Sequence, residues 1–263
     1  LTPDLSHTLA VERQFERVDQ PYWGTPLLRD AAKAVVGAVS IDPRTRDVNY
    51  NVLDGKYEQG VTWARSITDW RLTPSSRATH TVYHYDALRD YENVETYTWV
   101  NANSQVQRSN ALLQRHDQQV WGSRGEATHT ATVGGLKSDF AFGWDWSYNR
   151  QTRYPLSVAG PFDTTDPYAP APSHFYSTPG IVPGFVPGAT NQLRTLALFA
   201  ENRTEVAPTW AVTTALRVDR IALTVTNHRT VTATNPAVYT TSFSPVTGRV
   251  GVVKDLTPAW QVY

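Results

Sequence analysis

The run FAFGWDWSY, residues 140–148, decides the fold class of this chain. Every second residue of the run is aromatic, and the residues between them are small or polar. Successive side chains of a β-strand point to opposite faces, so one face of this segment is wholly aromatic and the other is small or polar. Five consecutive aromatic side chains on one strand face are difficult to pack in the core of a β-sandwich. A lipid-facing surface backed by a polar lumen accommodates them more easily.

This run belongs to a series of predicted antiparallel hairpins with short turns. Segments 117–133 and 139–153 are joined by the linker 134–138, which begins with two glycines. Three further pairs have the same pattern: 61–72 with 78–97, 193–206 with 210–226, and 246–254 with 260–263. Their turns are 73–77, 207–209 and 255–259. The sequence predicts about eight complete strands and one fragment.

The connections at the other ends of these hairpins are expected to be long. They are residues 20–57, about 98–106, 154–192 and 227–245, with a weak helical period only at 28–39. The stretch 154–192 holds eight of the seventeen prolines, so we expect no strand or helix of any length there. Short turns at one end and long loops at the other are typical of outer-membrane barrels. We therefore predict an all-β fold, an antiparallel transmembrane β-barrel segment with short periplasmic turns and long extracellular loops.

The composition excludes several other classes. The 263 residues include 24 basic and 24 acidic side chains, and this balance argues against a nucleic-acid partner. With no Cys there is no disulfide framework and no thiolate nucleophile. The absence of Met predicts that the chain is a processed or excised piece of a longer protein.

Several short motifs, in order along the chain, resemble the barrel of TonB-dependent siderophore receptors. Residues 198–202, followed by Trp210 and the strand 215–219, are similar to an aromatic-small-acidic strand and the strand that follows it in that family. Downstream, 243–245 and 249–258 resemble its serine-proline and arginine-valine-glycine strand, and upstream 20–26 resembles its tyrosine-glycine-x-proline loop. The family's plug domain, TonB box and later strands have no counterpart here. The resemblance thus implies that residues 1–263 are a partial β-barrel domain.

The function implied by this resemblance is ferric siderophore uptake across the bacterial outer membrane. Iron would arrive inside the siderophore, so no cofactor of the protein is expected. The partners would be the ferric siderophore, outer-membrane lipid and the TonB energy-transducing complex, the last reached through the missing N-terminal region. A passive porin-like channel and a secreted β-rich binding protein are the alternatives.

Aromatic side chains in the predicted loops are the candidate ligand-binding residues. Aromatic rings offer flat apolar contact, and neighbouring arginines offer charge-assisted bonds to an anionic chelate. The alternative is that these side chains pack within their own loops or mark the lipid interface, where Trp and Tyr are enriched. The candidates are Tyr22, Trp23, Tyr154, Phe162, Tyr168, Phe175 and Tyr176. We expect Tyr22 and Trp23 to lie close to the loop 154–192.

Enzymatic and metal-binding functions find little support. His80 and His84 share a strand face but lie roughly 13 Å apart, too far to chelate one ion. The carboxylates of Asp86, Asp90, Glu92 and Glu95 are expected at a solvated barrel rim, with a hydrolase pair as the alternative, and no hydrolase or nucleotide-binding motif is present. The sequence therefore predicts a non-enzymatic protein with no catalytic residues and no metal site.

The same alternation predicts the orientation of one charged pair. Arg217 and Asp219 are two residues apart and share the face opposite Leu216 and Val218. We expect both charged side chains to point into the lumen.

Overall fold

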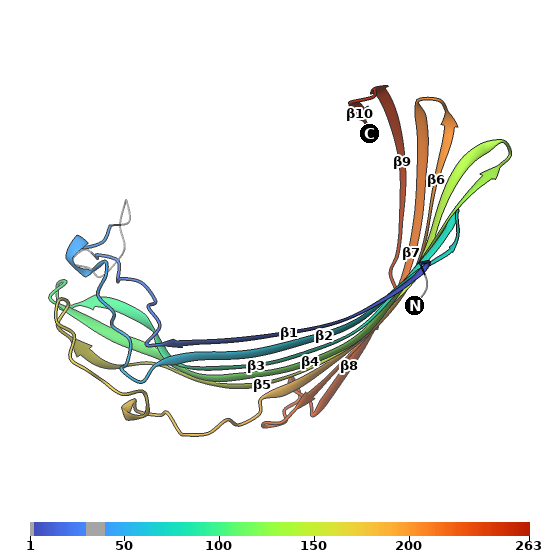
Figure 1. The fold of residues 1–263 in the computed structure, drawn as a ribbon. Helices are drawn as coiled ribbons and strands as arrows, with labels where there is room; N and C mark the ends of the chain where they lie inside the picture. The colour runs from blue at the N-terminus through green and yellow to red at the C-terminus, as the bar shows by residue number, and fades with distance from the viewer. Residues whose placement is uncertain (1–2, 30–39) are drawn as a thin grey trace.

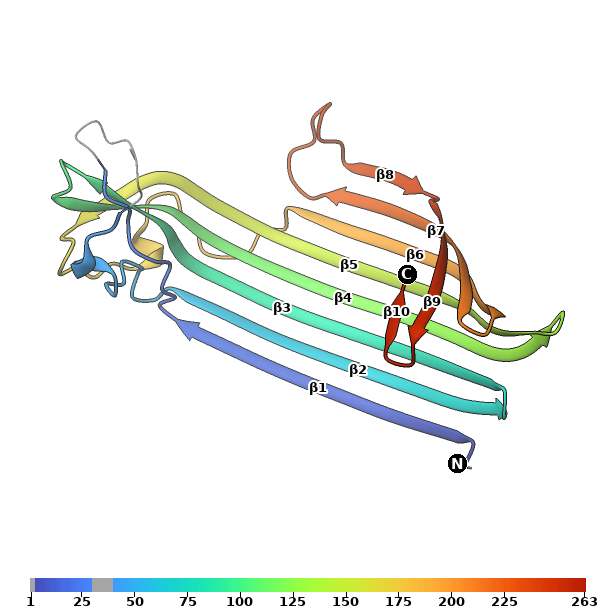
Figure 2. The ribbon, with the colours of Figure 1, turned by 90° about the horizontal axis from the view of Figure 1, so that it is seen from above.

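The computed structural model describes residues 3–29 and 40–263, which form a single antiparallel sheet of ten strands (Figure 1). The strands follow chain order across the sheet from β1 at one edge to β10 at the other (Figure 2). Their bounds are β1 Leu5–Asp19, β2 Lys56–Thr73, β3 Ser76–Val100, β4 Gln105–Val133, β5 Leu136–Thr165, β6 Ala189–Ala207, β7 Trp210–Asn227, β8 Val238–Phe243, β9 Val246–Thr257 and β10 Trp260–Val262. The predicted all-β antiparallel class is confirmed.

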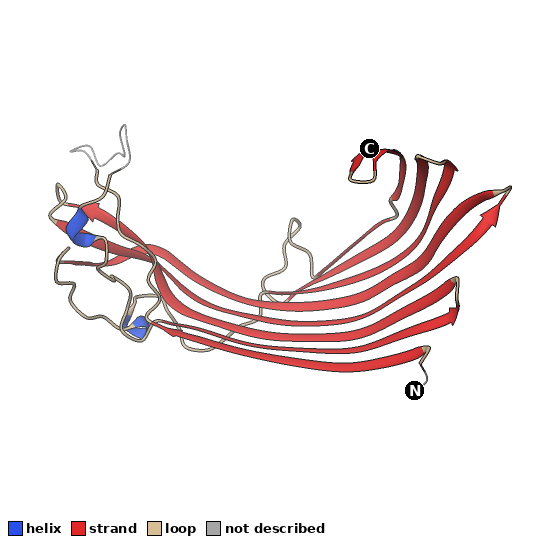
Figure 3. Ribbon diagram, turned by 45° about the horizontal axis from the view of Figure 1, so that its top comes forward, coloured by secondary structure: helices blue, strands red, loops and turns tan. Residues whose placement is uncertain are grey.

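The strands are long, and the loops after β1 and β5 gather at one end of the sheet, whereas the connection from β7 to β8 lies nearer its middle (Figure 3). Two short 3-10 helices, η1 (Pro43–Thr45) and η2 (Phe175–Ser177), lie in those loops. None of the helices in the described ranges has the length and apolar character to cross a membrane. The sheet is open: β1 forms one edge, and β10 and the short strand β8, which pairs with β7 alone, form the other.

The turns at the opposite end are tighter than the sequence predicted. The linker between β4 and β5 is only Gly134 and Gly135, both with positive φ, as a two-residue hairpin turn of the primed type requires. At the loop end, the connection predicted as long at 98–106 is short as well, because only residues 101–104 join β3 to β4. Asn101, Ala102 and Asn103 have positive φ there.

The prediction that 154–192 contains no strand is wrong. β5 continues to Thr165, although it includes Pro155 and Pro161. β5 pairs with β6 only as far as Arg153, so beyond that residue one side of β5 is an edge, where proline is tolerated. Pro161 lies at a register shift against β4.

Two other strands were missed. β1 was not assigned from the sequence, and β8 lies within the connection predicted at 227–245. β8 pairs with residues 221–226 of β7, and β9 pairs with residues 210–218. Together they occupy the position of one strand beside β7, interrupted at Pro245. The carbonyl of Pro245 still accepts a hydrogen bond from the backbone N–H of Asp219, at 3.0 Å. The weak helical period at 28–39 falls almost entirely outside the described residues.

The two faces of the sheet differ as the alternation predicted. Phe142, Trp144 and Trp146 are 51, 41 and 41% exposed, and among the described residues no second sheet covers them. Arg217 and Asp219 lie on the opposite face and form an ion pair at 2.8 Å, which confirms the predicted register of β7. We call the face with Trp144 the outer face and the face with Asp219 the inner face.

The curvature of the sheet distinguishes the two faces independently. The C-terminal strands β9 and β10 curl over the concave side, whereas the loop between β5 and β6 passes along the convex side (Figures 1 and 2). That loop covers Leu113 of β4. Leu113 shares a face with Gly125, the partner of Trp144, because the two are an even number of residues apart. The aromatic outer face is therefore convex and the charged inner face is concave.

Candidate functional site

Two loops pack together at the loop end of the sheet and form what we call the cap, residues 20–29, 40–55 and 166–188 with the strand ends they cover. The N–H of Leu53 donates to the carbonyl of Ser173 at 2.9 Å. The N–H of Phe175 donates to Asp54 Oδ1 at 2.7 Å. These bonds join segments that are more than a hundred residues apart in the sequence.

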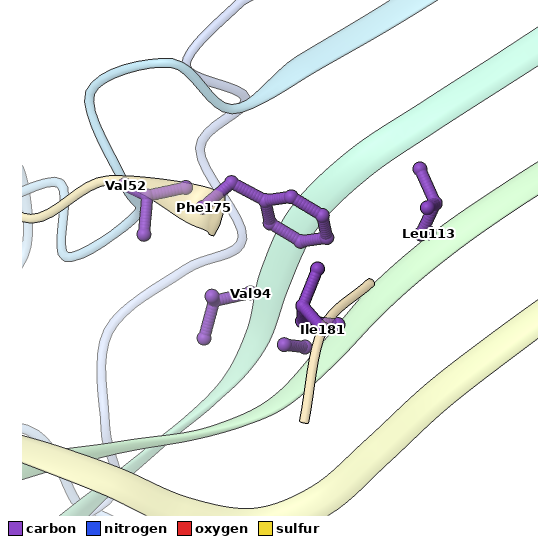
Figure 4. Close-up of a cluster of buried hydrophobic side chains, with 6 residues drawn as sticks. Val52, Val94, Leu113, Phe175 and Ile181 are labelled. Atoms are coloured by element: carbon purple, nitrogen blue, oxygen red, sulfur yellow. The ribbon is translucent and has the colours of Figure 1, made fainter. Parts of the chain in front are cut away.

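A buried hydrophobic cluster around Phe175 holds the second loop on the strands (Figure 4). Phe175 is fully buried, and it projects from η2 towards the strand residues Val94 and Leu113. Val52 of the first loop and Ile181 of the second complete the contact. The cluster lies on the outer side of the strand ends, so the second loop covers the convex wall above the aromatic band.

A second cluster lies nearer the strand tips. Tyr50, Trp99 and Val106 are buried together, and Trp99 Nε1 donates to the carbonyl of Pro26 at 3.1 Å. The Arg108 guanidinium is almost fully buried beside them and forms a bidentate pair with Asp163, at 2.6 and 2.7 Å. Burial raises the pKa of Tyr50 to about 12.

The exposed tip of the cap carries three of the candidate residues. Tyr22 and Trp23 are exposed, and Tyr22 donates its hydroxyl proton to the carbonyl of Arg46. The Tyr168 hydroxyl donates to Asp42 at 3.0 Å and accepts from Arg44, whose guanidinium carbon is 4.2 Å from the ring centre. Hydrogen bonds from Arg44 hold the pKa of Asp42 well below its usual range.

The other four candidates lie on or near the Phe175 cluster. Phe162 packs against the cluster, and Tyr176 is exposed with its ring 5.2 Å from that of Phe175. Tyr154 is half-buried and meets Phe185 edge to face at 6.4 Å. The structure thus gathers all seven candidates in one cap, but Phe175 is a core residue with no exposed surface.

A second polar and aromatic group lies on the inner face, and sequence reasoning missed it. We call Tyr57, Arg89, Tyr91 and His116 the inner cluster. Tyr57 and Tyr91 meet edge to face at 5.0 Å, and the Arg89 guanidinium lies 5.3 Å from the Tyr91 ring centre. Arg89 Nη2 donates to His116 Nδ1 at 2.6 Å. Tyr83, Tyr85, Arg89 and Tyr91 occupy alternate positions of β3, and this spacing was the available signal.

Several buried polar atoms on the inner face have no hydrogen-bond partner among the residues that the structure describes. They include Arg65 Nε, Arg89 Nε, His116 Nε2 and the side-chain amide of Asn93. Buried polar groups are normally hydrogen-bonded, so unpaired atoms concentrated on one face indicate a surface that meets further polar groups. Some inner-face charges are paired within the sheet, as in the ion pairs of Arg77 with Asp69 and of Arg217 with Asp219.

Metal ligands do not cluster in the residues that the structure describes: no three His, Asp or Glu side chains gather to hold an ion. His80 and His84 lie on the outer face and pack against Trp144 and Trp121, at 5.6 and 4.0 Å between ring centres. The rim carboxylates Asp90 and Glu92 pair with basic residues.

A single curved sheet with an apolar convex face and a polar concave face is the wall of a membrane β-barrel. The family model for the TonB dependent receptor-like β-barrel matches residues 2–263, and the chain belongs to this family of outer-membrane proteins. Among curated protein sequences no match was found.

Solved structures of siderophore receptors have the same fold. BauA, the ferric preacinetobactin receptor from Acinetobacter baumannii, superposes with a TM-score of 0.76 at 15% identity, over 98% of this chain and 36% of that one. The siderophore receptor PiuA from A. baumannii gives 0.75 at 16% identity, over 95 and 38%. The ferripyoverdine receptor of the outer membrane of Pseudomonas aeruginosa gives 0.74 at 16% identity, over 98 and 32%. The chain therefore spans about a third of the length of these receptors.

Proposed function

We propose that this chain is part of the wall of an outer-membrane receptor that imports ferric siderophores. The observation that carries the proposal is the inner cluster, which places arginine, histidine and tyrosine side chains with unpaired donors on the concave face close to the cap. A ferric siderophore presents anionic oxygens and flat organic groups, and guanidinium and aromatic side chains bind these by charge-assisted hydrogen bonds and stacking. The three receptors with the same fold are consistent with this ligand class.

In this proposal, the cap residues divide between two roles. Tyr22, Trp23 and Tyr168 are exposed at the tip and meet the ligand first. Tyr154, Phe162, Phe175 and Tyr176 hold the second loop on the strand ends and so fix the shape of the mouth. Iron stays inside the chelate, and the protein needs no cofactor and catalyses no reaction.

Transport in this scheme draws energy from the TonB complex through a plug in the intact receptor. A passive porin-like channel is the competing function. The two differ in their need for energy, because a passive channel continues to conduct when the inner membrane is de-energised.

The test is a binding titration on the intact receptor with a ferric catecholate and a ferric hydroxamate chelate. Arg89→Ala is expected to weaken binding of the preferred chelate at least tenfold, since one charge-assisted hydrogen-bonding group contributes about 1.5–3 kcal/mol. Arg124→Ala, on the same face but away from the cluster, is the matched control. Equal affinities in both variants, or uptake that persists without an energised inner membrane, would reject the proposal.

A further inference from the structure

Three arginines lie on the outer face of three neighbouring strands. Arg150 of β5 is on the same face as Trp144, because six residues separate them. Arg194 of β6 is paired with Tyr148, and Arg220 of β7 is paired with Leu196, which is itself the partner of Trp146. The three therefore form one line across the sheet, two residues lower on each successive strand. We call them the arginine line.

This line follows the tilt of the strands. The last residue pair before the β2–β3 turn is Thr73 with Ser76, and Ser76 is level with Phe140 of β5 because both pair with His129 of β4. The last pair before the β4–β5 turn is at Leu136, four residues lower on β5. The short turns mark one membrane surface of a barrel, and the last pair before the β6–β7 turn, Ala207 with Trp210, lies about one residue lower again. The line therefore descends in the same sense as the turns, and its three long side chains reach a similar level of the outer wall.

That level is the upper boundary of the apolar band. Below the line are the exposed side chains of Trp146, Leu196 and Val218. Arg194 lies directly at the edge of the band, with its guanidinium carbon 5.7 Å from the ring centre of Tyr148. Gln192 and Thr224 continue the surface above it on β6 and β7 with polar, uncharged groups.

The line carries uncompensated positive charge. Within the described residues, no carboxylate lies at ion-pair distance from Arg150, Arg194 or Arg220, although fourteen other ion pairs form. Of the other outer-face arginines, Arg115 pairs with Asp90 at 2.7 Å and Arg17 with Asp19 at 2.9 Å. Arg13 of β1 has no ion pair within the described residues, but it stands alone on its edge strand, whereas the arginine line brings three guanidinium groups together on neighbouring strands. Arg194 and Arg220 are both exposed.

We propose that the arginine line binds the phosphate of anionic lipid headgroups in the surrounding membrane leaflet. Guanidinium groups bind phosphate oxygens in bidentate geometry, and the apolar band below the line is where the acyl chains of the same lipid lie. The pairing of a charged row with an adjoining apolar band selects a lipid phosphate over a free phosphate ion. The inference rests on the outer face meeting lipid, and it is independent of the imported ligand.

The experiment uses native mass spectrometry of the intact receptor in detergent, titrated with phosphatidic acid and with phosphatidylcholine of the same acyl chains. The combined variant Arg194→Gln and Arg220→Gln is compared with Arg124→Gln and Arg153→Gln, which removes two exposed arginines from the inner face. Phosphatidic acid affinity is expected to fall roughly tenfold to thirtyfold in the outer-face variant and less than about twofold in the control. Phosphatidylcholine binding should not change in either.

Two further measurements separate loss of charge from loss of folding and test the lipid contact itself. Arg194→Lys with Arg220→Lys should retain most of the phosphatidic acid binding, which shows that charge and not folding was lost. Quenching of tryptophan fluorescence by brominated lipid, compared between the wild type and Trp144→Phe, tests separately whether the outer face meets lipid. Unchanged phosphatidic acid affinity in the outer-face variant, an equal loss in the control, or displacement by inorganic phosphate at the same concentration would overturn the proposal.

Discussion

The two ends of the sheet bury their side chains in different ways. The largest fully buried side chains all belong to the cap and the strand ends beneath it, among them Trp99, Tyr50 and Phe175. Around Trp144 and Leu198, at the turn end, the side chains of the outer face are large, apolar and exposed. The cap is thus stabilised by packing within the chain in water, whereas the turn end depends on lipid outside and on polar partners inside. The same sheet therefore meets water at the loop end and lipid at the turn end.

The largest effect on the difference between the two ends is expected from a substitution of Phe175. Replacing Phe175 by Ala leaves a cavity between the second loop and the strands, and we expect a loss of about 3–5 kcal/mol in the stability of the cap. The measurement is limited proteolysis of the loop 166–188 in the intact receptor, read against the heat-dependent gel migration of the barrel. Cleavage should increase while the barrel stays folded. A barrel that unfolds together with the loop would show that the two ends are one cooperative unit.

At the turn end, stability should be sensitive to a charge added on the outer face. Trp144→Arg is expected to cost about 2–4 kcal/mol if the residue lies near the bilayer midplane, because a cation there loses its hydration. Ser147→Arg places the same charge on the inner face and should be tolerated. Urea unfolding of the receptor in lipid vesicles measures both. Equal costs at the two positions would mean that the outer face is not in lipid.

This contrast also explains what could be predicted from the sequence. The alternation of 140–148 and the pair Arg217–Asp219 depend on neighbours along one strand, so period-two reasoning placed them correctly. The strand through Pro155 depends on where β6 stops pairing, which only the folded sheet defines. The burial of Phe175 depends on a loop that docks on strands more than sixty residues earlier, and no local pattern signals it.

The inner cluster shows the same limit for the candidate site. Tyr57 and Tyr91 are on different strands and meet because β2 and β3 pair in one register. The aromatic residues that composition made conspicuous were in the loops, whereas the inner cluster is spread over three strands. Alternation in β3 alone indicated a face with tyrosines, and the pairing with β2 and β4 was needed to bring Tyr57 and His116 to it.

The smallest expected effect concerns the cap at high pH and Tyr50. Its buried hydroxyl donates to the carbonyl of Pro167 at 2.6 Å, and burial raises its pKa to about 12 from an ordinary value of about 10. A raised pKa means that the stability contributed by the neutral group is complete below pH 10 and is lost as the pH rises towards 12. The neighbouring Tyr97, with its ring centre 5.5 Å from that of Tyr50, also has a raised pKa through burial, so the cap should loosen in this window.

Tyr50→Phe separates the hydrogen bond from the titration. At neutral pH, the variant loses one buried hydrogen bond, and we expect the cap to be less stable by about 1 kcal/mol. Between pH 10 and 12 the variant should lose less stability than the wild type, since one of the cap tyrosines with a raised pKa is gone and Tyr97, Tyr168 and Tyr176 remain. Proteolysis rates of the loops across pH 8–12 measure both effects. An alkaline loss as large in Tyr50→Phe as in the wild type would assign the transition to the other cap tyrosines, and the ionisation of Tyr50 would then not contribute to the loosening of the cap.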